Sequence, residues 1–138
     1  ISHELLPPTL EDFGLIEALK ELIEPIHKSS GIDIRFESTL EKGDFDNPQT
    51  ELNLFRVVQE MLNNSIKHAA ATHILIEMGT EGTNKYLLYR DNGRGFDQDA
   101  VQRRGLGLKN LESRARIIGA QTTFQSKPGA GFEARFDF

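Results

Sequence analysis

Two glycine-rich segments constrain the fold of this chain more than any other part of its sequence: residues 91–95, Asp-Asn-Gly-Arg-Gly, and residues 105–108, Gly-Leu-Gly-Leu. The first follows a strand pattern and the second opens a helix pattern. Each alone has an ordinary explanation, as a turn or as a loop-to-helix junction. Their order, with an acidic strand end before a helix N-terminus, favours a ligand site between them.

Apolar residues recur at helical spacing in three stretches. The first predicted helix covers residues 15–26 and stops at a Ser-Ser-Gly sequence. The second starts near residue 49, with Asp46 or Asn47 as its cap, and the third covers residues 108–118 and ends at a glycine. The apolar stripe predicted for the second helix consists of Leu52, Phe55, Val58, Leu62, Ile66 and Ala69.

Five stretches alternate or have the composition of strands: residues 32–36, 73–78, 85–89, 122–124 and 132–138. The second and third are predicted to form a hairpin around a turn at residues 79–84. The chain has no steady β-α-β rhythm and no internal repeat. We therefore expect an α/β fold, a two-layer α/β sandwich in which three main helices cover one face of a mixed five-stranded sheet.

Composition narrows the range of functions. The chain has 138 residues, enough for one domain with its own core, and no cysteine, which fits a reducing compartment. Its net charge of -5, without a basic block, argues against a nucleic-acid partner. No apolar run reaches the length of a membrane span, so we expect a cytoplasmic domain. The chain begins with Ile1 rather than methionine, which suggests a piece of a longer protein.

Four polar residues of the second predicted helix share one face: Glu60, Asn64, Lys67 and His68. At about 100° per residue, the last three fall within roughly an 80 to 100° arc of Glu60. The Asn64 amide oxygen suits Mg²⁺, Lys67 can donate to phosphate, and Glu60 can orient a metal-bound water. Taken alone, this segment is better explained as a solvated helix face with an i, i+4 acid-amide pair.

Asp91 shares the strand parity of the inward-facing Leu87 and Tyr89, so its carboxylate should point into the protein, where it needs a donor. The exocyclic amine of adenine is one such donor, and Gly93 and Gly95 would let a flat base approach the backbone. The alternative is a turn-capping aspartate that binds amides of its own loop.

The second glycine segment, Gly105, Leu106, Gly107 and Leu108, precedes a helix N-terminus, where free N–H groups and the helix dipole favour an anion such as a triphosphate. The spacing is neither that of a Walker loop nor that of a Rossmann βαβ unit.

In chain order, these pieces resemble the catalytic ATP-binding domain of sensor histidine kinases, in the wider family of gyrase-type ATPases, heat-shock-protein-90 chaperones and MutL. Residues 56–69 look like the N box of that family, residues 91–95 like its G1 box and residues 105–108 like its G2 box. The short lid and the sequence after the G2 box are most similar to the nitrate-sensor and DesK type. The resemblance implies the family's Bergerat fold.

Carried over by position, the resemblance implies that Asn64 ligates Mg²⁺, that Lys67 and His68 line the phosphate side, and that Asp91 accepts from the adenine amine. The backbone of residues 105–108 would wrap the phosphates.

Two positions of the predicted site need a separate interpretation. Glu60 would position the metal shell from the second coordination sphere rather than activate water, as the matching acid does in the ATPase branch. Phe132 stands where the family often has a threonine near the base, so a second polar contact would come from Thr122 or from water.

The implied reaction is transfer of the γ-phosphoryl group of MgATP to a histidine on an upstream dimerisation helix. Phosphate would then pass to an aspartate of a response regulator. We expect residues 1–12 to be the end of the dimerisation linker and residues 13–138 the catalytic domain. The parent would be a homodimer and a candidate for membrane anchoring, and this piece alone should not autophosphorylate.

His3, in the sequence Ser-His-Glu-Leu, superficially matches the phosphoacceptor signature of another kinase subfamily. Only one helix fits between His3 and Ile32, whereas a dimerising hairpin needs a second long helix there. We interpret His3 as an exposed side chain. Two alternatives to the histidine kinase remain: a serine kinase of the anti-sigma-factor type, and a nucleotide-sensing module without transfer activity.

Overall fold

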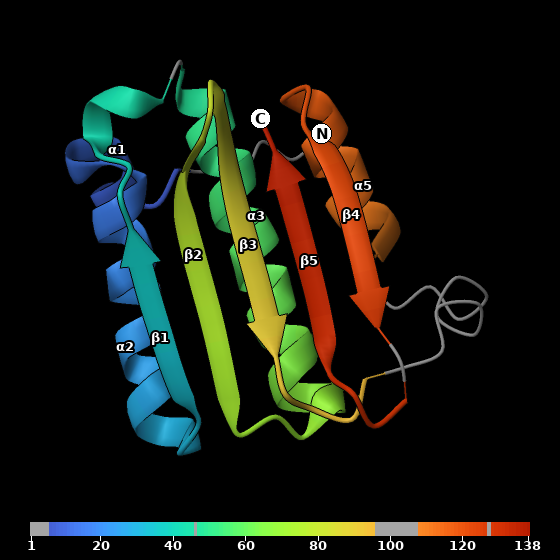
Figure 1. Cartoon of the computed structure of the whole chain (residues 1–138). Coiled ribbons are helices and arrows are strands. Elements are labelled where there is room, and N and C mark those ends of the chain that lie inside the picture. Colours follow the sequence, from blue (N-terminus) through green and yellow to red (C-terminus); the bar gives the residue numbers. More distant parts are fainter. Residues whose placement is uncertain (1–5, 46, 96–107, 127) are drawn as a thin grey trace, which may run out of the picture.

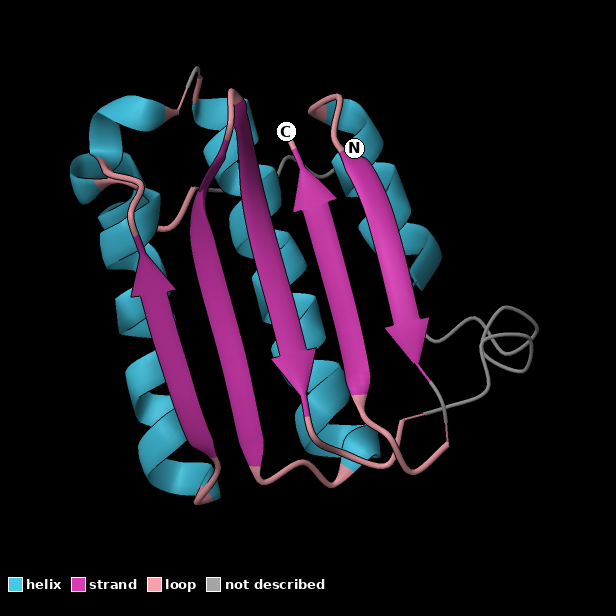
Figure 2. Ribbon diagram, in the orientation of Figure 1, coloured by secondary structure: helices cyan, strands magenta, loops and turns pink. Residues whose placement is uncertain are grey.

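The computed structural model describes residues 6–45, 47–95, 108–126 and 128–138, which build a five-stranded sheet backed by helices (Figures 1 and 2). The helical elements are α1 (Pro8–Phe13), α2 (Leu15–Ser30), the 3-10 turn η1 (Lys42–Asp44), α3 (Pro48–Asn64), the π-helical turn η2 (Ser65–Ala69) and α5 (Leu108–Ile117). The strands are β1 (Asp33–Ser38), β2 (His73–Glu81), β3 (Asn84–Asp91), β4 (Gln121–Ser126) and β5 (Phe132–Asp137). No helix among the described residues is long and apolar enough to cross a membrane.

The strand order is β1-β2-β3-β5-β4, so the last strand of the chain lies between β3 and β4. β1 pairs with β2 in parallel, and the other three pairings are antiparallel. The helices lie on one side of this mixed sheet (Figure 2). The predicted two-layer α/β sandwich is therefore confirmed, with α2, α3 and α5 as its three main helices.

The two faces of the sheet differ in chemistry. In β5, Phe132, Ala134 and Phe136 are buried against the helices, whereas the residues between them are only half-buried. The other face carries the ion pairs Arg90–Glu133 and Arg135–Glu81, each with a shortest N–O distance of 2.7 Å. The period-two pattern in the sequence thus separates an apolar core from a charged surface.

Helix α3 begins where the sequence predicted. Asn47 is the N-cap, and its side-chain oxygen accepts from the backbone N–H of Thr50 at 2.9 Å, while Pro48 fills the first helical position. Of the two candidate caps, Asn47 is confirmed, and Asp46 lies outside the described residues.

The end of this helix differs from the prediction. Leu52, Phe55, Val58 and Leu62 are buried as expected, but Ile66 is 41% exposed. The chain changes from α-helix to the π-helical turn η2 after Asn64, and π-type hydrogen bonds reduce the rotation per residue. A stripe extrapolated at α-helical spacing therefore assigns Ile66 to the wrong face.

The hairpin of β2 and β3 is tighter than expected. The strands run up to a two-residue turn, Gly82 and Thr83, rather than the predicted turn over residues 79–84. Gly79 is a strand residue: a Cβ there would come within 3.0 Å of the Thr39 hydroxyl and 3.1 Å of the Tyr86 hydroxyl. This glycine permits close packing within a strand, not a turn.

Candidate functional site

The described part of the predicted site lies at the end of the sheet where β3 stops and β5 begins. Asp91, the last residue of β3, pairs with Ile74 of β2 on one side and with Phe132 of β5 on the other, and Phe132 pairs in turn with Ser126 of β4. The C-terminal end of α3 and the turn η2 lie behind this edge of the sheet (Figure 1).

Asp91 is 5% exposed, and its carboxylate points to the helix side as strand parity predicted. One oxygen, Oδ2, accepts from the hydroxyl of Ser65 at 2.6 Å, and the other, Oδ1, accepts from the backbone N–H of Gly93 at 3.0 Å. Ser65 follows Asn64 directly, so this hydrogen bond joins the helix with the predicted phosphate-side residues to the strand with the predicted base-recognising acid.

Ser65 and Tyr89 form a buried polar group beside Asp91. The Tyr89 hydroxyl lies 2.5 Å from the Ser65 hydroxyl and donates to the backbone carbonyl of Met61 at 3.0 Å. Burial raises the pKa of Tyr89, so the phenol keeps its proton. Sequence reasoning missed both residues, because serine in a helix and tyrosine in a strand carry no signal of a contact 24 residues apart.

Gly131 is a third residue that the sequence did not single out. Its φ is +81°, and a Cβ built on it would overlap the backbone oxygen of Asp91. The strand that begins at Phe132 can approach Asp91 only because residue 131 has no side chain. The Gly-Ala-Gly sequence before β5 was the available clue.

Asn92, within the first glycine-rich segment (residues 91–95), is a clamp between two strands, because its side chain hydrogen-bonds to the residues at the start of β2. Its side-chain oxygen accepts from the backbone N–H groups of Thr72 and His73, each at 2.9 Å, and its amide donates to the Thr72 hydroxyl at 2.9 Å. One carboxamide therefore ties the exit of β3 to the entry of β2, next to η2.

Replacing Asn92 with alanine should lower the free energy of unfolding by about 1 kcal/mol, because two exposed backbone donors exchange a fixed acceptor for water. Urea denaturation followed by circular dichroism measures the change. The exposed Asn84, at the other end of β3, provides the matched control, and Asn84→Ala should cost under about 0.5 kcal/mol. Equal losses for the two variants would contradict the clamp.

The predicted polar face of α3 is only partly described. Glu60 and Asn64 are half-buried, with the Glu60 oxygen Oε2 fully buried, and Lys67 is exposed. The backbone of His68 lies in η2, and its side chain lies outside what the structure describes. Residues 105–107 lie wholly outside the described part of the chain. Leu108, which follows them, begins α5 and is 8% exposed.

The remaining predicted residues fall into two groups. Gly93 is buried and donates to Asp91, and Gly95 has a φ of +65°, a conformation that suits glycine. Thr122 is not brought to Asp91: it lies four residues before Ser126 on β4, about 13 Å away by strand rise. The β4 residue in register with Asp91 is Ser126, because both pair with Phe132 of β5. The Ser126 hydroxyl donates to the Gly131 carbonyl at 3.0 Å.

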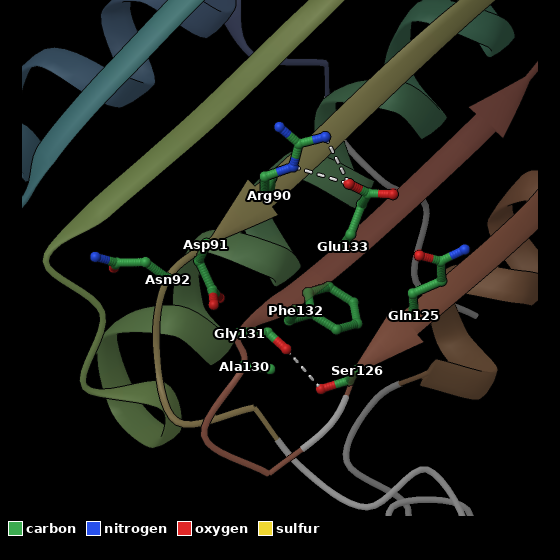
Figure 3. Close-up of a pocket in the computed structure, with 9 residues that line it drawn as sticks. All are labelled: Arg90, Asp91, Asn92, Gln125, Ser126, Ala130, Gly131, Phe132 and Glu133. Carbon is green, nitrogen blue, oxygen red and sulfur yellow. Dashed lines mark hydrogen bonds and ion pairs between the residues drawn. The ribbon is translucent and has the colours of Figure 1, made fainter.

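An open hollow of about 670 Å³ lies at this end of the sheet (Figure 3). Asp91, Ser126 and Phe132 line it from the helix-facing side of their strands, and Arg90, Gln125 and Glu133 from the charged face. The hollow thus wraps around the strand ends, and Asp91 borders open space.

Comparison with known proteins agrees with this geometry. Residues 49–138 match the model of the family described as histidine kinase-, DNA gyrase B-, and HSP90-like ATPase. The histidine-protein kinase/phosphatase DegS of Brevibacillus brevis is 33% identical over 131 residues, which cover 95% of this chain and 34% of that protein. The sensor histidine kinase ComP of Bacillus subtilis is 33% identical over 96% of this chain and 17% of its own length.

Solved structures show the same fold. The histidine kinase domain of the Erythrobacter litoralis EL346 blue-light activated kinase superposes with a TM-score of 0.68 at 18% identity, over 89% of this chain and 58% of that chain. The catalytic domain of histidine kinase ThkA gives a TM-score of 0.66 at 18% identity, over 90% and 89%.

The chain spans about a third or less of the length of these curated relatives. Its family match nevertheless covers more than half of its own residues and includes the strand end and helix that meet at Asp91. The expected family is therefore confirmed: the chain belongs to the histidine kinase-, DNA gyrase B- and HSP90-like ATPases, as an ATP-binding domain of the sensor histidine kinase type.

Proposed function

We propose that this chain holds MgATP at the Asp91 end of the sheet and presents the γ-phosphoryl group to a histidine of its parent protein. The observation that carries the proposal is the buried Asp91 carboxylate, which Ser65 ties to the end of the α3 helix. A nucleotide that contacts Asp91 with its base would extend its phosphates along Asn64 and Lys67.

Asp91 has the capacity to recognise adenine. A carboxylate offers about four lone-pair sites, and the two hydrogen bonds from Ser65 and Gly93 leave one on each oxygen. The exocyclic amine of adenine donates, whereas guanine presents a carbonyl oxygen at the same position. An acceptor facing an acceptor is repelled, so the site should favour ATP over GTP.

The residues at the end of α3 fit a magnesium ion. Asn64 supplies a half-buried amide oxygen, a hard ligand of the kind that Mg²⁺ uses together with phosphate oxygens and waters. Glu60, one turn earlier, can orient a water of the metal shell from the second coordination sphere. The bound ion would neutralise charge on the β- and γ-phosphates.

The phosphate side would be completed by Lys67, His68 and the backbone of residues 105–108. Support comes from Leu108, which begins α5 and packs in the core, so the residues just before it precede a helix N-terminus. Free N–H groups and the helix dipole stabilise an anion at such a position.

The transfer needs no nucleophile from this chain. An imidazole nitrogen of the acceptor histidine would form the new bond to the γ-phosphorus as the bond to the β-phosphate oxygen breaks, leaving ADP. Positioning and charge neutralisation dominate such a step, which suits a site of backbone amides, cations and one metal ion.

The acceptor histidine would lie on a dimerisation helix of the parent protein, outside these residues, and phosphate would pass on to a response-regulator aspartate. The parent would be a homodimer and a candidate for membrane anchoring. The boundary between linker and catalytic domain, placed after residue 12, stays a prediction. Leu10 of α1 is 4% exposed and packs in the same core as α2, so residues ahead of that boundary also contact the domain.

Asn64→Ala should lower the affinity for ATP about tenfold in the presence of magnesium, because one metal ligand is lost. In EDTA the variant and the unmutated chain should bind ATP equally. Isothermal titration calorimetry measures both conditions. The control is Asn63→Ala, which removes the same group from the exposed neighbouring position. Binding that ignores both magnesium and Asn64 would reject the metal assignment.

Phosphotransfer requires a separate experiment. The chain is incubated with radiolabelled MgATP and a helical, histidine-bearing dimerisation domain, or with a serine-bearing antagonist protein. Acid-labile, base-stable phosphate on the first partner supports the histidine kinase. Acid-stable phosphate on the second would favour a serine kinase of the anti-sigma-factor type. ATP binding without transfer to either would favour a nucleotide-sensing module.

A further inference from the structure

We propose that Ser65 and Tyr89 are positioning residues for Asp91, and that their hydroxyl groups form a buried relay that sets the selectivity of the site for a 6-aminopurine. The inference rests on the proposed role of Asp91 in base recognition and assigns that recognition to three side chains rather than one.

The relay is built from residues with little exposure to solvent. Tyr89 is 0% exposed, Ser65 2% and Asp91 5%. The Tyr89 and Ser65 hydroxyl oxygens lie 2.5 Å apart, and Ser65 lies 2.6 Å from Asp91 Oδ2. These contacts are short for hydrogen bonds between oxygens, as expected when a charged group ends the chain of donors.

Counting protons gives the relay a direction. An ionised carboxylate can only accept, so the Ser65 proton goes to Asp91. The Tyr89 proton then serves both remaining contacts, to Ser65 and to the Met61 carbonyl. The Ser65 dipole points toward Asp91. The Tyr89 dipole lies between the Ser65 oxygen and the Met61 carbonyl, and its component toward Ser65 strengthens the Ser65 donor in the low dielectric of the core.

The relay also fixes the orientation of the carboxylate. The hydroxyl from α3–η2 holds Oδ2, while the Gly93 amide holds Oδ1 on the opposite side. With both oxygens anchored, rotation of the carboxyl group is restrained and the free lone pairs face fixed directions. A base that donates an amine meets an acceptor already in place, which reduces the ordering cost of binding.

A purely structural role for these hydroxyls makes a different prediction. Loss of packing or stability would weaken the binding of every nucleotide alike. Loss of carboxylate positioning would weaken only nucleotides that bring an amine to Asp91. The two are separated by comparing ATP with purine riboside 5′-triphosphate, which has the same sugar and phosphates but no 6-amino group.

The experiment titrates both nucleotides into the chain and its variants by calorimetry, with thermal unfolding recorded for each. Ser65→Ala removes the donor to Asp91, and Tyr89→Phe removes the phenol oxygen but keeps the ring. The matched controls are Ser113→Ala, an exposed serine of α5, and Tyr86→Phe, a tyrosine of β3 on the charged face of the sheet.

Ser65→Ala should lower the affinity for ATP about tenfold and leave that for purine riboside triphosphate unchanged. Tyr89→Phe should show the same pattern with about a threefold loss. If Ser65→Ala does not fold, Tyr89→Phe decides alone. An equal loss for both nucleotides, or no loss for either, overturns the relay. Equal binding of the two nucleotides by the unmutated chain would instead refute the role of Asp91 itself.

Discussion

Asp91→Asn is expected to lower the affinity for ATP about a hundredfold and to abolish the preference over GTP. The substitution keeps the shape of the side chain and replaces one acceptor oxygen with an NH₂ donor. Both oxygens already accept from the protein, Oδ2 from Ser65 and Oδ1 from Gly93. Whichever position the new NH₂ group takes, it faces an existing donor in a buried place and loses the charge-assisted contact to the base.

Calorimetry with ATP and GTP tests this expectation, and thermal unfolding reports whether the variant is folded. Asp137→Asn is the matched control, since Asp137 ends β5 and pairs with Arg135 on the charged face. It should bind ATP like the unmutated chain. If the unmutated chain bound ATP and GTP equally, the base-recognising role of Asp91 would be wrong.

Gly131→Ala is expected to destabilise the domain by about 4 kcal/mol, enough to unfold a marginally stable protein. Two costs combine. A side chain at φ +81° is strained by about 1–2 kcal/mol, and the added Cβ overlaps the backbone oxygen of Asp91. That oxygen belongs to a strand paired on both sides, so it cannot retreat without breaking β-sheet hydrogen bonds.

Chemical denaturation measures the free energy of unfolding of this variant beside Gly119→Ala. Gly119 also has a positive φ, +71°, but a Cβ there meets nothing within 4 Å. Its substitution isolates the backbone strain, about 1–2 kcal/mol, from the overlap. If the two variants lost the same stability, the close approach between β3 and β5 would not be the constraint that the geometry indicates.

Periodicity predicted most of the fold because each element has one apolar face. Strand parity alone was enough to turn Asp91 inward, and composition at the start of α3 was enough to propose Asn47 as a cap. The order of the glycine segments predicted that the base and phosphate residues share one region. The hydrogen bond between Ser65 and Asp91 joins the end of α3 to the end of β3, and the shared nucleotide site itself stays a prediction.

The parts that escaped prediction depend on tertiary contacts. Tyr89 and Ser65 are 24 positions apart in the sequence, and neither a serine in a helix nor a tyrosine in a strand indicates by itself that it has a buried hydrogen-bond partner. Ile66 was assigned to the core because the turn to π-helix has no local signature in the sequence. Gly79 was interpreted as a turn residue, since only the packed neighbours Thr39 and Tyr86 reveal why glycine is needed in a strand.

The strand order has a consequence for how this domain matures during synthesis. β5, the last strand to be translated, is inserted between β3 and β4 rather than added at an edge. Until residues 132–137 leave the ribosome, β3 has an unpaired edge and β4 has no neighbour in the sheet. A chain that lacks these residues therefore exposes unpaired strand edges, and such edges are prone to aggregate until β5 is in place.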